Sequence, residues 1–442
     1  MYLTDKILLL KMACNLPEER LNMKFSRYLA LCILGSTLLL FTSCSSQNNI
    51  VNPSPGIWKI VHSVNPGIAQ NGLNAVAATS ANDAWAVGNF SNNHLNTLGG
   101  KALIEHWNGS AWSVATSPKT PLDSSILNGV AAISPVDAWA VGYAFSDSNS
   151  NEQQTLIEHW DGATWKIVKS PNPANGNDLF AIAALSATDI WTVGVYGYNL
   201  GQTLVTRTLI EHWNGTTWTV VQSSNPGSGF NYLTGLTAIS TNDIWAVGFS
   251  SSGQTVQGMQ ETLIEHWNGT AWTVVQSQSP GTNGNTLSAI TAISANDVWA
   301  VGNTNNDSSV TDTLIEHWNG SAWSTVEGQS PGKESNYLSA VVAVSPHDVW
   351  AIGSFNSVFS DQQAQPLIEH WNGSAWSTVT SPNIGTNNTT LGGIGLVPHS
   401  TNIWAVGSGA TFGTVSVPSP NATQPISVMS VTAQTLIESC CS

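Results

Sequence analysis

The sequence predicts an all-β protein, a seven-bladed β-propeller of four-stranded antiparallel blades. Three observations predict it: a long internal repeat, four short strand patterns in each repeat, and tight turns that alternate with long connections. A repeat of about 52 residues indicates a solenoid, a propeller or an array, and propellers carry four to eight blades. The W-[AT]-[VI]-G motif marks seven copies, spaced 51 to 54 residues apart: Trp85, Trp139, Trp191, Trp245, Trp299, Trp350 and Trp404.

Two further tryptophan motifs keep the same period. The E-H-W motif ends at Trp107, Trp160, Trp213, Trp267, Trp318 and Trp371. The W-x-x-V motif begins at Trp58, Trp112, Trp165, Trp218, Trp272, Trp323 and Trp376. The three sets account for all 20 tryptophans, so we expect these rings to fill the widening wedge between neighbouring blades, while an alanine-rich first strand crowds at the axis.

The second repeat shows the four expected strands, at residues 127–134, 138–144, 155–160 and 164–170. An S-x-x-D turn joins the first two, and Asp161-Gly162, elsewhere Asn-Gly, joins the last two as a hairpin turn. The other connections are long and vary between repeats. Since alternate connections of a meander fall on opposite edges, we expect one plain face and one variable face.

The two ends of the repeat region predict how the ring closes. Residues 57–62 form a lone fourth strand, and residues 435–438 form a lone third strand. Pairing them completes the seventh blade and removes free sheet edges. Residues 439–442, SCCS, replace the expected HWNG and are predicted to be an irregular tail, either of a degenerate capping blade or of a truncated one.

The strings S-x-x-D-[VIA]-W-A-V-G, L-I-E-H-W-[ND]-G-[ST]-x-W and W-x-x-V resemble the repeats of bacterial exported propellers of the kelch, tectonin and Asp-box type. The resemblance covers residues 57 to 438. It implies the fold, and it leaves function open, because similar propellers serve as lectins, adhesion modules, scaffolds and enzyme domains.

The first 43 residues predict export. Met23 is the expected start of a lipoprotein signal peptide, with Lys24 and Arg27 before an apolar run at residues 28–41. The resemblance to lipoprotein signals implies that Cys44 is lipidated and that residues 44–56 form a tether. We therefore expect an exported protein, lipid-anchored at the bacterial cell envelope or surface; the alternative is an uncleaved membrane anchor.

Charge and cysteine content exclude other classes. After residue 43 the chain has 7 Lys and Arg against 24 Asp and Glu, which disfavours nucleic acid as a partner. The repeats contain no cysteine, so no disulfide framework is expected in them; Cys440 and Cys441 lie at the end. We expect a monomer.

Three repeated motifs with polar residues are predicted to be structural. The Glu-His pairs alternate across a strand and diverge around the ring, so we expect interblade hydrogen bonds rather than a metal site. They are Glu105-His106, Glu158-His159, Glu211-His212, Glu265-His266, Glu316-His317 and Glu369-His370. We expect Asp83, Asp137, Asp189, Asp243, Asp297 and Asp348 to cap the N–H groups of their own turns. The Asn-Gly-Ser/Thr sequons are read as two-residue hairpin turns.

One loop has the spacing of a calcium site. Asp147, Asn149 and Asn151 follow the D-x-N-x-N pattern, with Glu158 at the twelfth position. However, Glu152 replaces the glycine that the turn needs, and Glu158 already belongs to the repeat. We expect no metal and no cofactor, with calcium as a minor alternative.

Aromatic residues on or near the long loops are the candidate ligand-binding residues, together with the only arginine after residue 43. They are Tyr143, Phe145, Tyr196, Tyr198, Arg207, Phe230, Tyr232, Phe249 and Tyr337. A long loop at residues 408–434 is the leading feature without a counterpart in other repeats. These observations favour a non-catalytic binding platform for a glycan or an extracellular or envelope protein. The alternatives are a propeller enzyme acting on polysaccharide and a structural or degenerate repeat protein.

Overall fold

A computed structural model describes residues 57–92, 100–147, 152–200, 203–253, 259–306, 310–356, 363–382, 388–417 and 426–441; at 199–200, 203, 411–417 and 426–432 it describes the backbone alone. The predicted signal peptide, Cys44 and the predicted tether lie outside these residues. The elements found within them are all β-strands. No helix among the described residues is long and apolar enough to span a membrane.

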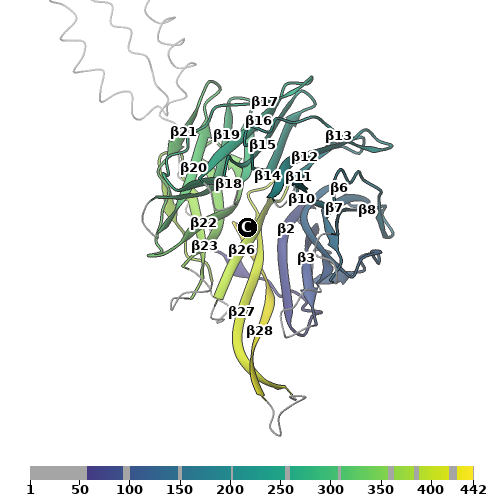
Figure 1. The fold of residues 1–442 in the computed structure, drawn as a ribbon. Helices are drawn as coiled ribbons and strands as arrows, with labels where there is room; N and C mark the ends of the chain where they lie inside the picture. Colours follow the sequence, from purple (N-terminus) through teal and green to yellow (C-terminus); the bar gives the residue numbers. More distant parts are fainter. Residues whose placement is uncertain are drawn as a thin grey trace, which may run out of the picture. The chain divides into compact units, whose positions relative to one another are not determined.

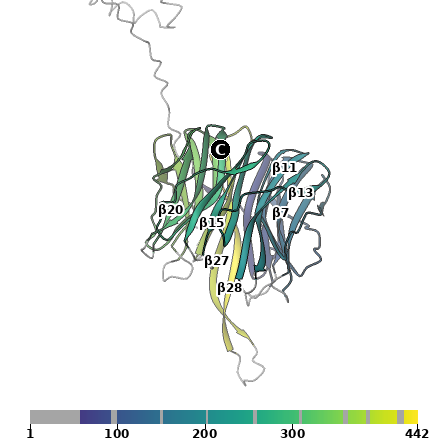
Figure 2. The ribbon, with the colours of Figure 1, turned by 45° about the horizontal axis from the view of Figure 1, so that its top comes forward.

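The strands form seven four-stranded antiparallel sheets arranged around an axis, which confirms the predicted fold class (Figures 1 and 2). Blades 1 to 3 comprise β2 (Gln70–Ser80), β3 (Asp83–Ser91), β4 (Lys101–Trp107) and β5 (Trp112–Ala115); β6 (Ser124–Ser134), β7 (Asp137–Phe145), β8 (Gln153–Trp160) and β9 (Trp165–Ile167); β10 (Gly176–Ser186), β11 (Asp189–Leu200), β12 (Thr203–Trp213) and β13 (Trp218–Val220). Blades 4 to 6 comprise β14 (Phe230–Ser240), β15 (Asp243–Ser251), β16 (Gln260–Trp267) and β17 (Trp272–Val274); β18 (Gly284–Ser294), β19 (Asp297–Asn305), β20 (Thr311–Trp318) and β21 (Trp323–Val326); β22 (Asn336–Ser345), β23 (Asp348–Phe355), β24 (Gln365–Trp371) and β25 (Trp376–Thr378). Blade 7 comprises β26 (Asn388–Leu396), β27 (Ile403–Val417), β28 (Ile426–Cys440) and β1 (Lys59–Ile60).

The first strand of every blade lines a central cavity of about 240 Å³. Each of these strands carries a bulge just after a buried leucine, as between Leu73 and Ala75. The bulged residue reaches the next blade: Asn74 Nδ2 donates to the Leu127 carbonyl at 2.9 Å, and Asn128 Nδ2 donates to the Leu179 carbonyl at 2.9 Å. Polar residues at the axis therefore join neighbouring blades by hydrogen bonds. Small residues beside them allow the seven first strands to pack closely around the axis.

Tryptophans fill the interface between blades, as predicted. Trp85 on β3 of blade 1 lies 5.0 Å from both Trp160 and Trp165 of blade 2, measured between ring centroids. The W-x-x-V tryptophans are buried, with Trp165 only 5% exposed. Aromatic rings at this separation pack favourably, so each interface gains both buried area and ring contacts.

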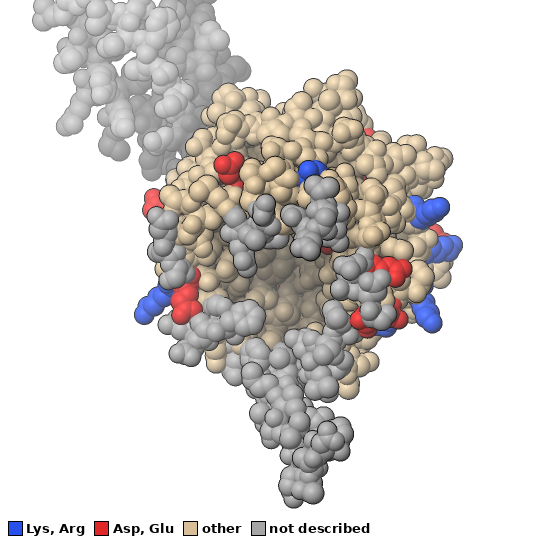
Figure 3. Space-filling model, in the orientation of Figure 1, with Lys and Arg blue, Asp and Glu red and all other residues tan. Residues whose placement is uncertain are grey.

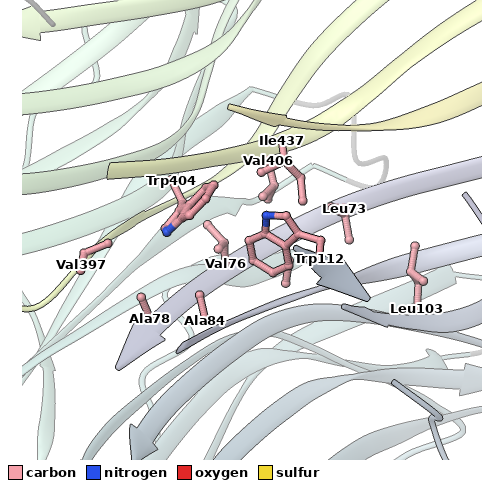
Figure 4. Close-up of a cluster of buried hydrophobic side chains, with 11 residues drawn as sticks. Leu73, Val76, Ala78, Ala84, Leu103, Trp112, Val397, Trp404, Val406 and Ile437 are labelled. Carbon is pink, nitrogen blue, oxygen red and sulfur yellow. The ribbon is translucent and has the colours of Figure 1, made fainter. Parts of the chain in front are cut away.

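Blade 7 is built from both ends of the chain, which confirms the predicted closure. β1 pairs with β28 through Lys59–Ser439 and Ile60–Glu438. Trp58 contacts Trp350 of blade 6 at 5.6 Å, and Trp404 contacts Trp107 of blade 1 at 5.2 Å. The cluster at the blade 7–blade 1 interface joins residues from opposite ends of the sequence (Figure 4).

Two predictions for blade 7 are wrong. Residues 439–440 are not an irregular tail, because β28 continues to Cys440, which pairs with Ile403. Cys440 is buried where the other blades place the E-H-W tryptophan, and it forms a disulfide with Cys441. The predicted loop at residues 408–434 is largely a hairpin: β27 and β28 pair from Ile403–Cys440 out to Val417–Ile426 and project as a two-stranded arm (Figure 1).

The hairpin turns between third and fourth strands form at the predicted sites with different geometry. Asn108 N donates to the Ala111 carbonyl at 3.3 Å, so the turn spans four residues. Asn108 Oδ1 accepts hydrogen bonds from the N–H groups of Ser110 and Ala111 at 3.0 and 3.1 Å. Gly109 alone has a positive φ, of 90°, in this turn. The sequon asparagine thus stabilises the turn with its own side chain.

The repeated aspartates are structural, but the prediction that they cap their own turns is wrong about the partner. Asp137 Oδ1 accepts a hydrogen bond from Trp139 Nε1 at 3.0 Å and lies 2.9 Å from His159 Nε2. The turn N–H of Val136 instead donates to Ser134 Oγ. The same Asp–His pair recurs at 2.7 to 2.9 Å in His106–Asp83, His212–Asp189, His266–Asp243, His317–Asp297 and His370–Asp348.

The repeated glutamates are fully buried between blades. Glu105 of blade 1 accepts from Ser63 Oγ, which follows β1 of blade 7, at 2.9 and 3.0 Å. Glu265 of blade 4 accepts equivalent bonds from Ser223, which follows β13 of blade 3. The predicted interblade bonds are thus confirmed for these glutamates, whereas the histidines bond within their own blade. Glu211 is the exception: neither carboxylate oxygen has a hydrogen-bond partner among the described residues.

Candidate ligand-binding site

One residue at the mouth of the ring departs from its counterparts in charge. Asp178 lies near the start of β10, directly before the buried Leu179. Long connections enter the first strands here, so the position belongs to the variable face. The residues at the same place in the other six blades are uncharged: Gly72, Ile126, Tyr232, Thr286, Tyr337 and Thr390.

Asp178 lines a cavity of about 510 Å³ on blade 3. The rest of the lining mixes aromatic, aliphatic and neutral polar side chains from three blades: Gln153, Asn175, Gly176, Val195, Gly197, Tyr198, Leu204, Thr206 and Tyr232. Tyr198 and Leu204 are 40% and 46% exposed, so the apolar part of the wall faces solvent. A cavity of this size with a few convergent polar groups is the usual form of a small-ligand site.

The carboxyl group of Asp178 has a buried oxygen, Oδ1, without a hydrogen-bond partner among the described residues. Burial raises the pKa of Asp178 to about 7. Burial also raises the pKa of Tyr143 and of Tyr232, and the nearby charge of Asp178 adds to both shifts. An unpaired carboxyl group flanked by two tyrosines is unusual in a protein interior and marks a candidate functional site.

The predicted loop aromatics fall into three pairs and two separate residues. Ring contacts join Tyr143 to Phe145, Tyr196 to Tyr198, and Tyr232 to Phe249 at 5.7, 6.5 and 4.8 Å. Of these six, Tyr198 and Tyr232 line the Asp178 cavity.

The other candidates do not join this site. Phe230 is only 2% exposed, so the prediction that it contacts ligand is wrong. Tyr337 is 38% exposed but lies on blade 6. Arg207 Nη1 donates to the Thr206 carbonyl at 2.9 Å and is not part of the cavity lining.

The calcium alternative gains no support from the described residues. Asn149 and Asn151 lie outside them. Asp147 Oδ1 accepts from Ser124 Oγ at 2.6 Å, and Glu158 is fully buried and bonded to Ser117 at 2.9 Å. Glu158 is therefore engaged between blades and does not act as the twelfth ligand of a loop.

Sequence reasoning missed Asp178, Gln153, Asn175 and Thr206, because it searched the loops, whereas these residues lie in or beside strands. Aligning the seven first strands column by column would have revealed Asp178, since it is the one charged residue in its column.

No protein-family model matches the sequence, and no curated protein matches it at a significant level. Solved structures with a similar chain path include YCF48 bound to D1 peptide, with 12% identity and a TM-score of 0.47, over 80% of this chain and 92% of that one. An ulvan lyase bound to its saccharide has 10% identity and a TM-score of 0.47, over 77% and 92%. The SapL1 lectin in complex with alpha methyl fucoside has 12% identity and a TM-score of 0.38, over 71% and 97%. Similarity at this level assigns no function.

Proposed function

We propose that this protein is a non-catalytic binding platform for a glycan, which enters the cavity beside Asp178. The observation that carries the proposal is the unpartnered Asp178 oxygen in a cavity walled by Tyr198 and Tyr232. A carboxylate accepts hydrogen bonds from hydroxyl groups, and a tyrosine ring packs against an apolar face. A sugar offers both, and Gln153, Asn175 and Thr206 add neutral polar groups in the same cavity.

The distribution of acids favours binding over catalysis. Glycoside hydrolysis usually needs a pair of carboxyl groups flanking the bond to be cleaved. Asp178 is the only acidic residue in the described lining of this cavity. The acids that recur around the ring serve the fold, as Glu105 does with Ser63 and Asp137 does with Trp139.

Glycan-array binding by the full chain in detergent tests the proposal. We expect at least one glycan to bind wild type, and Asp178→Ala or Tyr232→Ala to weaken that binding about tenfold or more. Tyr337→Ala is the matched control, because Tyr337 occupies the position of Tyr232 in blade 6, and its binding should equal wild type. Retained binding in Asp178→Ala and Tyr232→Ala, capture of a protein instead of a glycan, or turnover of a polysaccharide would each overturn the proposal.

We also propose that the protein is exported and held at the bacterial cell envelope by lipid on Cys44. The cysteine follows the basic and apolar segments of a signal peptide, which supports this location. In cells, Cys44→Ser should move the protein from the membrane fraction to the soluble fraction. If wild-type protein from the membrane fraction carries no lipid on Cys44 by mass spectrometry, the lipid-anchor proposal is wrong.

A further inference from the structure

The ring contains a second kind of pocket, and it occurs in two blades with the same construction. In blade 1 the pocket of about 380 Å³ lies between Phe90 at the end of β3, Lys101 at the start of β4, and the segment after β5 that includes Ser117. In blade 6 a pocket of about 300 Å³ lies between Phe355, Gln365 and the segment that includes Ser381. Phe90 pairs with Lys101, and Phe355 pairs with Gln365, so the two pockets are repeat equivalents.

The two pockets differ in charge. Lys101 and Lys119 both line the blade 1 pocket, whereas the described lining of the blade 6 pocket contains no Lys or Arg. After residue 43 the chain has only seven Lys and Arg, so two of the seven gather at one pocket. Most of the described surface on the viewed face is uncharged, and its Lys, Arg, Asp and Glu side chains gather mainly toward the left and right edges (Figure 3).

Two acidic residues, Asp123 and Glu158, contact residues that line the blade 1 pocket. The Lys101 ammonium donates to the backbone carbonyl of Asp123, while the Asp123 carboxylate accepts from Ser146 Oγ at 3.3 Å and from Asp147 N at 3.2 Å. Glu158 lies behind Ser117, is fully buried and accepts its hydroxyl at 2.9 Å. None of these acids lines the pocket, so its described charged lining is entirely cationic.

The rest of the pocket suits a ring with polar substituents. Phe90 is partly buried and presents an aromatic wall, and the hydroxyl groups of Thr116, Ser117 and Thr120 lie along the opposite segment. Thr120 and Ser125 are held in place, since Thr120 Oγ1 donates to the Leu122 carbonyl and Ser125 Oγ accepts from Ala102 N at 3.1 Å. Two lysines beside an aromatic wall can hold an anionic group while the ring rests on the phenyl face.

We infer that the blade 1 pocket is a separate binding site for an acidic saccharide, whose carboxylate or sulfate group lies between Lys101 and Lys119. The site is distinct from the Asp178 cavity in residues, blade and ligand charge. Because the whole chain carries a net charge of −15, anions are repelled elsewhere on the surface, and a bound anion requires local cations of this kind.

Calorimetric titration of the full chain in detergent tests the inference, with an oligomer of glucuronic acid, a sulfated oligosaccharide and a neutral glucose oligomer as probes. We expect one or both acidic probes to bind and the neutral one not to bind at this site. Lys101→Gln with Lys119→Gln should weaken binding about tenfold or more. The matched control is Lys166→Gln with Lys169→Gln, which removes the same charge from exposed positions outside the pocket and should bind as wild type.

Three outcomes would overturn the inference: neither acidic probe binds wild type, the pocket variant binds as tightly as wild type, or the control variant loses binding to the same degree. Loss in both variants would show a general charge effect in place of a site. Asp178→Ala should leave the binding of the acidic probe unchanged, so failure of this inference and failure of the glycan proposal are distinguishable. Unchanged unfolding midpoints of both lysine variants confirm that the fold is intact.

Discussion

Because Glu211 is fully buried and neither carboxyl oxygen has a hydrogen-bond partner among the described residues, we predict that the propeller loses stability as the pH rises. Burial raises the pKa of Glu211 from 4.5 to about 8. Between pH 4.5 and about pH 8, Glu211 has released its proton in the unfolded chain but still holds it in the folded chain. The contribution of Glu211 to stability is fully present below about pH 4.5, and it is lost as the pH rises from there through the folded pKa of about 8.

The size of the effect follows from the two pKa values. A folded pKa of about 8 and an unfolded value of 4.5 correspond to about 4 kcal/mol of stability lost between pH 4 and pH 8. Glu211→Gln keeps the shape and cannot ionise, so it should not share this loss. The free energy of unfolding of the variant minus that of wild type should therefore be about 4 kcal/mol larger at pH 8 than at pH 4, which means that the variant is relatively more stable at pH 8.

Urea unfolding followed by circular dichroism at pH 4 and pH 8 measures this difference. Glu261→Gln is the control, because Glu261 is exposed on β16, and its stability should stay within about 0.5 kcal/mol of wild type at both pH values. A Glu211→Gln effect that is the same at both pH values would refute the reasoning, since the cost would then be unrelated to ionisation.

Three further predictions concern the repeat, each measured by urea unfolding. Trp58→Ala should cost about 3–5 kcal/mol, because it removes a buried ring from the closing blade; a cost below 1 kcal/mol would show that closure does not depend on Trp58. Gly109→Ala should cost about 1 kcal/mol or more, since φ is 90° and a Cβ would lie 2.8 Å from Asn82 Oδ1; a neutral result would contradict the turn geometry. Asp137→Ala should cost about 1–3 kcal/mol by leaving Trp139 Nε1 without its acceptor, and an unchanged midpoint would exclude that bond.

The parts of the fold that repeat could be predicted from the sequence, because each position is seen several times. Tryptophan spacing identified the blades, and the lone strands at residues 57–62 and 435–438 identified the closing pair. The partners of the repeated aspartates could not be predicted, since Asp137, Trp139 and His159 meet only after two strands have paired. The arm of β27 and β28 was also missed: its Ser and Thr content is typical of loops, and among the described residues the only similar extension is the shorter hairpin of β11 and β12, which ends at Leu200–Thr203.

The candidate site was predicted only in part for a related reason. Tyr198 and Tyr232 were identified by their place near variable loops. Asp178 was not identified, because it lies within the first-strand pattern of its blade. That pattern was read as structural in all blades, although only blade 3 has a charged residue at this position. In a protein built from repeats, such departures carry more information about function than the conserved pattern of the repeat itself.

The shared seventh blade affects how the molecule assembles. Among the described strands β1 comes first in the sequence and β28 comes last, so the closing pair cannot form until all the other blades have been synthesised. Until then the flank of blade 1 that will meet Trp404 remains open to water. β1 is two residues long, so few backbone hydrogen bonds join it to β28, and the buried Trp58 adds a ring contact with Trp350 of blade 6. Pairing of β1 with β28 is therefore the last strand pairing of the ring that synthesis permits.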